Sequence, residues 1–160
     1  MTIKKNLLVM LAMAFLFSVP VISLQAQSAS EKVKGEIAEA LKQFNTAAQN
    51  ASTDQLMLLF DDTENIMFIG SDSAEIWKGH EQIRRHLNSI FPKERVFLDM
   101  SRTDIDCNGE TAWIFADGTI SITGEKGEKM TAPYRFTGIL VKKNHLWKWR
   151  LFDGSSPAGK

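Results

Sequence analysis

Hydrophobic and polar positions change their spacing once along this chain, at about residue 95. Before that point, apolar residues recur every three or four positions, as on one face of a helix. The pattern predicts three helices: one between the N-cap Ser30 and Asn50, a short one after Ser52, and one that ends before Pro92. The N-terminal half is therefore expected to be mainly helical.

After residue 95, apolar and polar residues alternate, which is typical of half-buried strands. A short apolar strand is also expected earlier, at 65–70, between the second and third helices. Turn residues such as Asn108-Gly109 separate the later strands. The four long strands are predicted at 95–106, 110–123, 130–142 and 146–155. Helices followed by consecutive antiparallel strands indicate an α+β domain, with the helices packed on one face of the sheet.

The last two strands form a hairpin whose register decides which side chains share a face. A three-residue loop at 143–145 would place Arg135 opposite Asp153, with the odd-numbered residues of both strands on the inner face. A register shifted by one would place Tyr134 opposite Asp153 instead, and apolarity alone does not exclude it. The first register is preferred because a two-residue Lys-Asn loop would require positive φ at Lys143.

Residues 1–26 have the parts of a secretory signal peptide. Lys4 and Lys5 supply positive charge, an uncharged apolar run follows from Leu7 to Val19, and Ala26 is a small residue at the expected cleavage point. The run is shorter than the about 20 residues that a membrane-spanning helix needs. We therefore expect an exported protein, periplasmic or secreted, with no membrane attachment after signal removal and one domain at 30–158.

Charge and motif content exclude several classes of function. Removing the two lysines of 1–26 from the 19 basic residues leaves 17 against 19 acidic residues, so no nucleic-acid partner is expected. Cys107 is the only cysteine, which rules out an internal disulfide. The histidines, His80, His86 and His145, lack metal-ligand spacing and are predicted to lie on the surface. We expect no metal and no cofactor.

Three short stretches, in this order, resemble the SnoaL-like type of the NTF2-like superfamily. They are Ile76-Trp-Lys-Gly79, the stretch from Arg135 to Val141 that reads Arg-x-Thr-Gly-Ile-Leu-Val, and the stretch from Trp147 to Ser155 followed by Pro157. The resemblance covers nearly all of the chain after the signal segment.

The resemblance implies a cone-shaped α+β roll, in which a strongly curved sheet folds round the helices and encloses an apolar pocket. It also implies a homodimer through the outer face of the sheet. The family commonly has a histidine in the last strand where this chain has Asp153. A mechanism based on that histidine is therefore not expected here.

Arg135 and Asp153 are the candidate catalytic and ligand-binding pair. In an apolar cavity they could orient a ligand carbonyl or carboxylate, or Asp153 could activate water as a general base. A structural ion pair at the end of the sheet is the equal alternative. The side chains expected to line the pocket beside this pair are Trp77, Trp113, Tyr134 and Trp149.

Three functions remain open at this stage. The leading hypothesis is an exported protein that binds a small, largely apolar organic molecule in the pocket. The first alternative is a hydro-lyase, isomerase or hydrolase that uses Asp153 as its base. The second is a homodimeric interaction module with a side-chain-filled cavity, for which the small residues Ala112, Ala116 and Gly118 on one strand face would serve.

Overall fold

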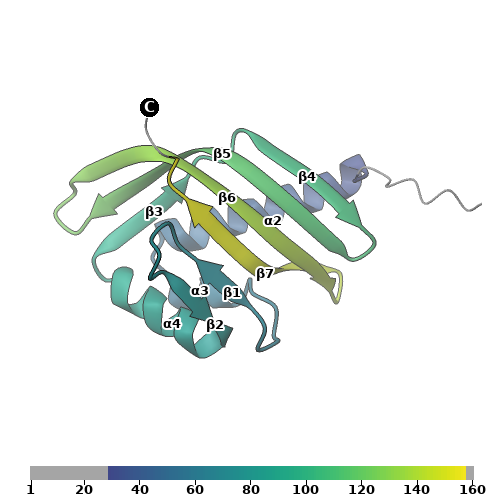
Figure 1. The fold of residues 1–160 in the computed structure, drawn as a ribbon, viewed down its shortest axis with the longest axis horizontal. Helices are drawn as coiled ribbons and strands as arrows, with labels where there is room; N and C mark the ends of the chain where they lie inside the picture. The colour runs from purple at the N-terminus through teal and green to yellow at the C-terminus, as the bar shows by residue number, and fades with distance from the viewer. Residues whose placement is uncertain (1–28, 158–160) are drawn as a thin grey trace, which may run out of the picture.

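The computed structural model describes residues 29–157, which form three helices and a curled sheet (Figure 1). The predicted signal peptide lies outside the described residues. The helices are α2 (Glu31–Gln49), α3 (Thr53–Met57) and α4 (Gly79–Ile90). The strands are β1 (Met67–Ile69), β2 (Ile76–Lys78), β3 (Glu94–Leu98), β4 (Thr103–Asn108), β5 (Thr111–Gly124), β6 (Lys129–Lys143) and β7 (Leu146–Ser155).

The predicted helix starts are confirmed by side-chain caps. The Ser30 hydroxyl accepts a hydrogen bond from the Val33 N–H at 3.4 Å, and the Ser52 hydroxyl accepts one from the Gln55 N–H at 3.3 Å. Each bond satisfies an N–H group that has no partner inside its helix. Within residues 29–157, no helix is both long and apolar enough to cross a membrane.

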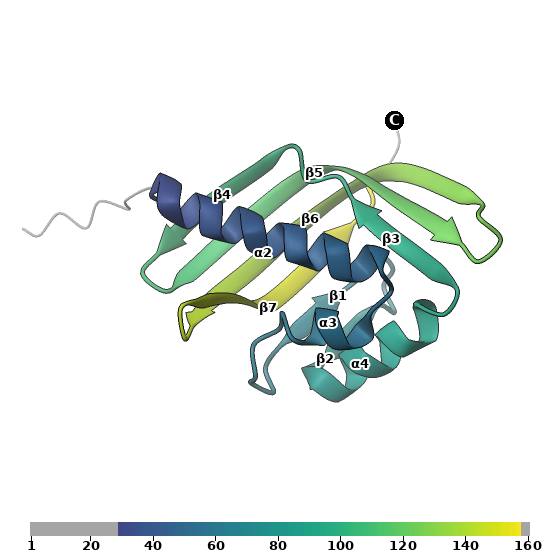
Figure 2. The same ribbon diagram turned by 180° about the vertical axis from the view of Figure 1, so that it is seen from behind.

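The sheet has the strand order β2-β1-β7-β6-β5-β3, and β4 also pairs with β5. All neighbouring strands are antiparallel except β1 and β7, which are parallel. The strand β2, which directly precedes α4, is not among the strands predicted from the sequence. The helices lie together on the concave side of the sheet, with α2 running across it and α3 and α4 below (Figure 2). This is the predicted α+β class.

The strand predicted at 95–106 is instead two strands, β3 and β4, separated by a turn. The Ser101 N–H donates to the Asp99 carboxylate at 3.0 Å, which is a local bond that competes with strand pairing. The backbone at Asp99 also lies close to β5, since a Cβ at Gly118 would come within 2.5 Å of the Asp99 carbonyl oxygen. A glycine at 118 thus permits the corner where β3 gives way to β4.

Both registers predicted for the last hairpin are wrong. The loop has two residues, Asn144 and His145, with φ of 48° and 66°, and Lys143 pairs with Leu146. Positive φ at both loop residues is the geometry of a tight hairpin turn whose twist matches that of the strands. Lys143 itself does not have positive φ, so the reason given for excluding a two-residue loop does not apply.

One extra residue in β7 changes which side chains face inward. Leu140 pairs with Trp149 and Ile139 pairs with Leu151, so Arg150 is unmatched and forms a β-bulge. The bulge reverses the alternation along β7. Trp147 and Trp149 face inward before it, and Phe152 faces inward after it, leaving the Asp153 side chain on the exposed face.

The inward residues of β6 are even-numbered, so the prediction of an odd-numbered inner face is wrong for this strand. Tyr134, Phe136 and Leu140 are buried, whereas Arg135 and Thr137 are exposed. The odd-numbered prediction holds only for Trp147 and Trp149 in β7.

The core lies between α2 and the concave face of the sheet. Phe44 of α2 contacts Trp149 with ring centroids 4.8 Å apart and Phe152 at 5.4 Å. Ala112 and Ala116 face this core and are 0% and 1% exposed. Two of the three small residues expected to serve an interaction module are therefore already buried inside the domain, and Gly118 is half-buried.

Two glycine-to-alanine substitutions are expected to change stability in opposite directions. A Cβ at Gly138 would lie 2.5 Å from the Trp149 ring and 2.8 Å from Ile114, so Gly138→Ala should destabilise by about 1–3 kcal/mol. A Cβ at Gly35, in the exposed face of α2, would meet nothing within 4 Å. Gly35→Ala should therefore stabilise by about 0.5–1 kcal/mol, because glycine is the poorer helix residue. Urea denaturation measures both, and equal effects would contradict the packing described.

Candidate functional site

A cavity of about 210 Å³ lies under α4, between the end of α2 and the curled part of the sheet. Residues from all three helices and from six strands or their connections contribute to its wall. Most of its lining is apolar, with a few polar side chains among them. The lining residues are Phe44, Ala48, Leu56, Phe68, Gly70, Ser71, Glu75, Trp77, His86, Ile90, Phe91, Glu94, Val96, Leu98, Ile120, Ile122, Tyr134 and Phe152.

Stacked aromatic rings form one wall of this cavity. The Trp77 indole of β2 stacks on the His86 imidazole of α4, with ring centroids 3.4 Å apart and planes at 16°. Phe68 of β1 contacts Trp77 at 5.8 Å and stacks on Phe152 of β7 at 4.8 Å. The consecutive elements β1, β2 and α4, together with the distant β7, thus build one aromatic surface, which presents flat apolar area to a bound molecule.

Glu75 enters the cavity from the loop that joins β1 to β2. The loop is closed by a hydrogen bond from the Gly70 N–H to the Glu75 carbonyl at 2.8 Å. The Glu75 carboxylate accepts a bond from the Asp72 N–H at 3.1 Å and folds over Gly70. A Cβ at Gly70 would lie 2.1 Å from this carboxylate, so glycine is needed for its position.

His86 is held in its neutral form by its surroundings. Burial lowers its pKa below the ordinary value, and the Glu75 carboxylate opposes this shift only in part. A neutral imidazole can donate one hydrogen bond and accept another. Its stacking on Trp77 keeps the ring at the cavity wall.

Tyr134 places the only tyrosine hydroxyl of the chain at the cavity. Burial raises its pKa to about 12, with smaller contributions from the Glu75 and Asp153 carboxylates, so the phenol keeps its proton. The hydroxyl lies over the backbone of β7, where a Cβ at Gly154 would come within 1.7 Å of it. The glycine at 154 therefore makes room for the phenol.

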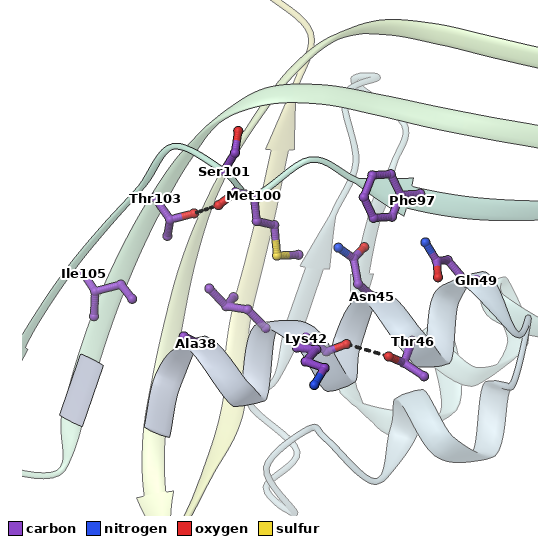
Figure 3. A pocket seen from close by; sticks show the side chains of 11 residues that line it. Ala38, Lys42, Asn45, Thr46, Gln49, Phe97, Met100, Ser101, Thr103 and Ile105 are labelled. Atoms are coloured by element: carbon purple, nitrogen blue, oxygen red, sulfur yellow. Dashed lines mark hydrogen bonds between the residues drawn. The ribbon is translucent and has the colours of Figure 1, made fainter. Parts of the chain in front are cut away.

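A second, larger hollow of about 480 Å³ runs between α2 and the corner of β3 and β4 (Figure 3). Three of its polar side chains, those of Asn45, Thr46 and Thr103, are bonded within the protein. The Asn45 amide donates to the Leu98 carbonyl at 2.7 Å and accepts from the Leu98 N–H at 2.9 Å. The Thr46 and Thr103 hydroxyls donate to the carbonyls of Lys42 and Met100, at 2.9 and 2.7 Å. This groove lacks the stacked aromatic wall, the carboxylates and the phenol that line the first cavity.

Of the residues predicted to line the pocket, Trp77 and Tyr134 do line the cavity. Trp149 instead lies in the core, 0% exposed, against Phe44, Phe136 and Phe152. Its indole N–H has no hydrogen-bond partner among the described residues.

Trp113, Arg135 and Asp153 lie on the outer face of the sheet, away from the cavity. Trp113 is 44% exposed. The predicted Arg135–Asp153 pairing is wrong, because Asp153 pairs with Thr137 and Arg135 pairs with Ser155 across the strands. Arg135 Nε instead donates to the Asp117 carboxylate at 3.1 Å. Arg102 binds the other Asp117 oxygen at 3.2 Å, so this cluster is a surface ion network.

Among the ionisable side chains that line the cavity, Glu75, His86 and Glu94 were not identified from the sequence. His86 was expected on the surface together with His80. It lies three residues after the buried Ile83, so the apolar stripe of its helix could have indicated a half-buried position. Glu75 and Glu94 carry no such signal, because only the folded sheet brings them together.

Within the part of the chain that the structure describes, no group of three or more histidine, cysteine or acidic side chains could hold a metal ion. The polar groups of the cavity are a phenol, an imidazole, two carboxylates and the Ser71 hydroxyl, beside an aromatic wall. These groups can bind and orient an organic molecule through hydrogen bonds.

A curled, mainly antiparallel sheet wrapped round helices, with a cavity between them, defines the NTF2-like class of α+β domain. The model of the SnoaL-like domain family matches residues 37–159. The chain therefore belongs to the SnoaL-like domain family. No curated protein matches the chain in sequence.

Solved structures with this fold are numerous. A candidate dehydratase of the NTF2-like family from Streptomyces avermitilis superposes with a TM-score of 0.72 at 14% identity, over 81% of this chain and 100% of that one. An NTF2-like superfamily protein from Salmonella enterica serovar Typhimurium gives 0.70 at 20% identity, over 82% and 96%. A candidate calcium/calmodulin-dependent protein kinase II association domain from Xanthomonas campestris gives 0.67 at 16%, over 78% and 88%. At these identities the similarity establishes the fold.

Lowering the pH below about 6.5, the ordinary imidazole pKa, is expected to reduce the free energy of unfolding through His86. In the unfolded chain this side chain takes up a proton near that pH, whereas in the folded protein burial keeps it neutral to a lower pH. The unfolded state therefore binds more protons in this interval, and stability falls as the pH falls. Urea denaturation at a series of pH values measures the effect.

His86→Gln is the variant that isolates this contribution. It should make the fall in stability shallower than in the wild type, whereas His145→Asn in the exposed turn should leave it in place. Three carboxyl groups also have lowered pKa values: that of Glu36 lies below 4.5, and those of Asp61 and Asp99 lie below 3.8. These groups titrate at lower pH than the interval just below 6.5 in which His86 acts. An identical pH dependence in His86→Gln and the wild type would contradict a neutral, buried imidazole.

Proposed function

We propose that this protein binds a small, largely apolar organic molecule in the cavity beneath α4. The observation that carries the proposal is the aromatic wall of Phe68, Trp77 and Phe152 beside the polar side chains of Glu75, His86 and Tyr134. Apolar concave sites with a few convergent polar groups are the usual form of small-molecule sites in proteins.

The size of the cavity limits the ligand. An apolar cavity of roughly 150 Å³ in another protein holds benzene. The cavity here, at about 210 Å³, suits one ring or branched chain of similar size with a short polar substituent. Larger polycyclic molecules would require the β1–β2 loop or α4 to move.

The polar side chains of the cavity determine which polar substituents of a ligand could form hydrogen bonds there. The Tyr134 phenol remains protonated and can donate a hydrogen bond to an oxygen of the ligand. Glu75 can accept a hydrogen bond from a hydroxyl or amino group. A role for Asp153 as general base gains no support, because its carboxylate lies on the exposed face of the sheet.

Binding of benzyl alcohol to the purified protein, measured by calorimetry or ligand-observed NMR, tests the proposal. Ala48 lines the cavity and is 4% exposed, so Ala48→Leu places three additional carbons in that space. We expect this substitution to weaken binding by roughly tenfold or more, as overlap with a filled cavity would.

Ala38→Leu is the matched control, because Ala38 is exposed on the same helix and lines the second groove instead of the cavity. It should leave the affinity unchanged. Trp77→Ala, at a half-buried position, should weaken binding by removing the aromatic wall. Loss of affinity in Ala38→Leu, or unchanged affinity in both cavity variants, would place the ligand elsewhere.

We also propose that the outer face of the sheet forms a homodimer. Trp113 and Phe115 are 44% and 42% exposed on adjacent outward positions of β5, and Ile139 and Leu151 continue the Trp113 row across β6 and β7. An apolar strip of this kind is unusual on the surface of a monomer. The candidate association domain from Xanthomonas campestris shares this fold.

Sedimentation of the purified domain tests the dimer. Trp113→Lys should shift the protein to monomer at concentrations where the wild type is dimeric, because burying a lysine in the apolar strip is costly. Leu58→Lys, at a side chain 70% exposed beside α3, should leave the dimer intact. A wild type that sediments as a monomer at all concentrations would refute the interface.

A further inference from the structure

We propose that the cavity selects a small organic ammonium ion, one ring or branched chain carrying a protonated amine, over neutral and anionic analogues. This inference rests on the proposed function and names the chemical class of its ligand. The geometry that carries it is a pair of cavity-lining carboxylates, Glu75 and Glu94, together with the buried phenol of Tyr134.

The two carboxylates are free to receive a positive charge. Neither Glu75 nor Glu94 takes part in a salt bridge with any residue of 29–157. They enter the cavity from different elements, Glu75 from the β1–β2 loop and Glu94 from the first position of β3. A positively charged ligand between Glu75 and Glu94 would be attracted by both carboxylates. The attraction is stronger in a partly buried site than between the same charges in water.

No lysine or arginine is among the cavity-lining residues. Two basic residues flank Glu94 in sequence, Lys93 and Arg95; both are exposed and neither lines the cavity. Arg95 follows Glu94 in β3 and so points to the opposite face of the strand. Its guanidinium donates to the carbonyls of Phe91 and Glu94, at 2.8 and 3.2 Å. A carboxylate or phosphate ligand would therefore find repulsion at the cavity and no cationic partner in its lining.

The Tyr134 hydroxyl is a second feature of the cavity that favours a positively charged ligand. The side chain is 8% exposed, lines the cavity, and forms no hydrogen bond with another described residue. The charges that act on its hydroxyl, those of Glu75 and Asp153, are both negative. The phenol oxygen can accept a hydrogen bond from the N–H of an ammonium group that the cavity carboxylates, Glu75 and Glu94, attract.

The aromatic lining is compatible with a cation. Phe44, Phe68, Trp77, Phe91 and Phe152 line the same space as the two carboxylates. Aromatic rings attract ammonium groups through the negative potential of their faces, tryptophan most strongly. The rings would also bury the hydrocarbon part of the ligand, so one cavity serves both ends of an arylalkylamine.

Three probes of nearly equal size and different charge test the proposal: benzylamine, benzyl alcohol and benzoate. Calorimetry at pH 7.5 on the purified domain would give the three affinities. We expect benzylamine to bind about tenfold more tightly than benzyl alcohol, as one charge-assisted hydrogen bond can provide. Benzoate should bind more weakly than either.

Glu75→Gln keeps the shape of the side chain and removes its charge. It should reduce the preference for benzylamine over benzyl alcohol to about threefold or less while leaving the affinity for benzyl alcohol nearly unchanged. Glu94→Gln is a second, independent variant with the same expectation. Glu110→Gln removes one charge from the exposed β4–β5 turn, at the other end of β5, and should keep the full preference.

The possible outcomes distinguish the ammonium selectivity from the more general proposal of a small-molecule site. An ammonium preference that Glu75→Gln or Glu94→Gln reduces, and Glu110→Gln does not, supports the inference. Binding of benzyl alcohol with no preference for the amine, or with tighter binding of benzoate, overturns the ammonium selectivity and leaves the small-molecule site. Absence of binding by all three probes, the neutral one included, overturns the small-molecule site and this inference with it.

Discussion

The contact between Asp61 and Arg150 is the constraint on which the arrangement of the sheet depends. Arg150 is the unmatched residue of β7, and its Nε donates to the Asp61 carboxylate at 2.8 Å. The Asp61 N–H also donates to the Trp149 carbonyl at 2.9 Å. Burial raises the pKa of Asp61, but the hydrogen bonds and charge of Arg150 outweigh it and hold the pKa below its ordinary value. A carboxylate 1% exposed requires such a partner, so the segment after α3 is fixed against the bulge.

The cavity follows from this bulge. Beyond Arg150, the inward positions of β7 become Phe152 and Gly154, which supply one wall and the space for the Tyr134 phenol. The parallel strand β1 pairs with the same part of β7, since Phe68 lies opposite Phe152. That pairing carries the β1–β2 loop, and with it Glu75, to the cavity. One inserted residue, Arg150, thus determines both the aromatic wall and the position of a carboxylate, that of Glu75, 75 residues away in sequence.

Local signals predicted much of the secondary structure. The caps at Ser30 and Ser52, the apolar stripe of the long helix, and the strand at 146–155 all match the structure, because each depends on residues close together in the chain. The hairpin register did not follow from the same reasoning. It depends on two consecutive positive φ values at Asn144 and His145 and on a bulge whose partner, Asp61, lies 89 residues from Arg150.

The sequence by itself determined the α+β class, the order of the elements and the resemblance to the SnoaL-like family, because periodicity and turn residues act locally. It also identified Trp77 and Tyr134 as residues near a pocket. Only the tertiary structure decided that Asp153 and Arg135 lie outside and that Glu75, Glu94 and His86 lie inside. A period of two defines two faces of a strand, but the bulge and the strands that pair across the sheet determine which face is enclosed.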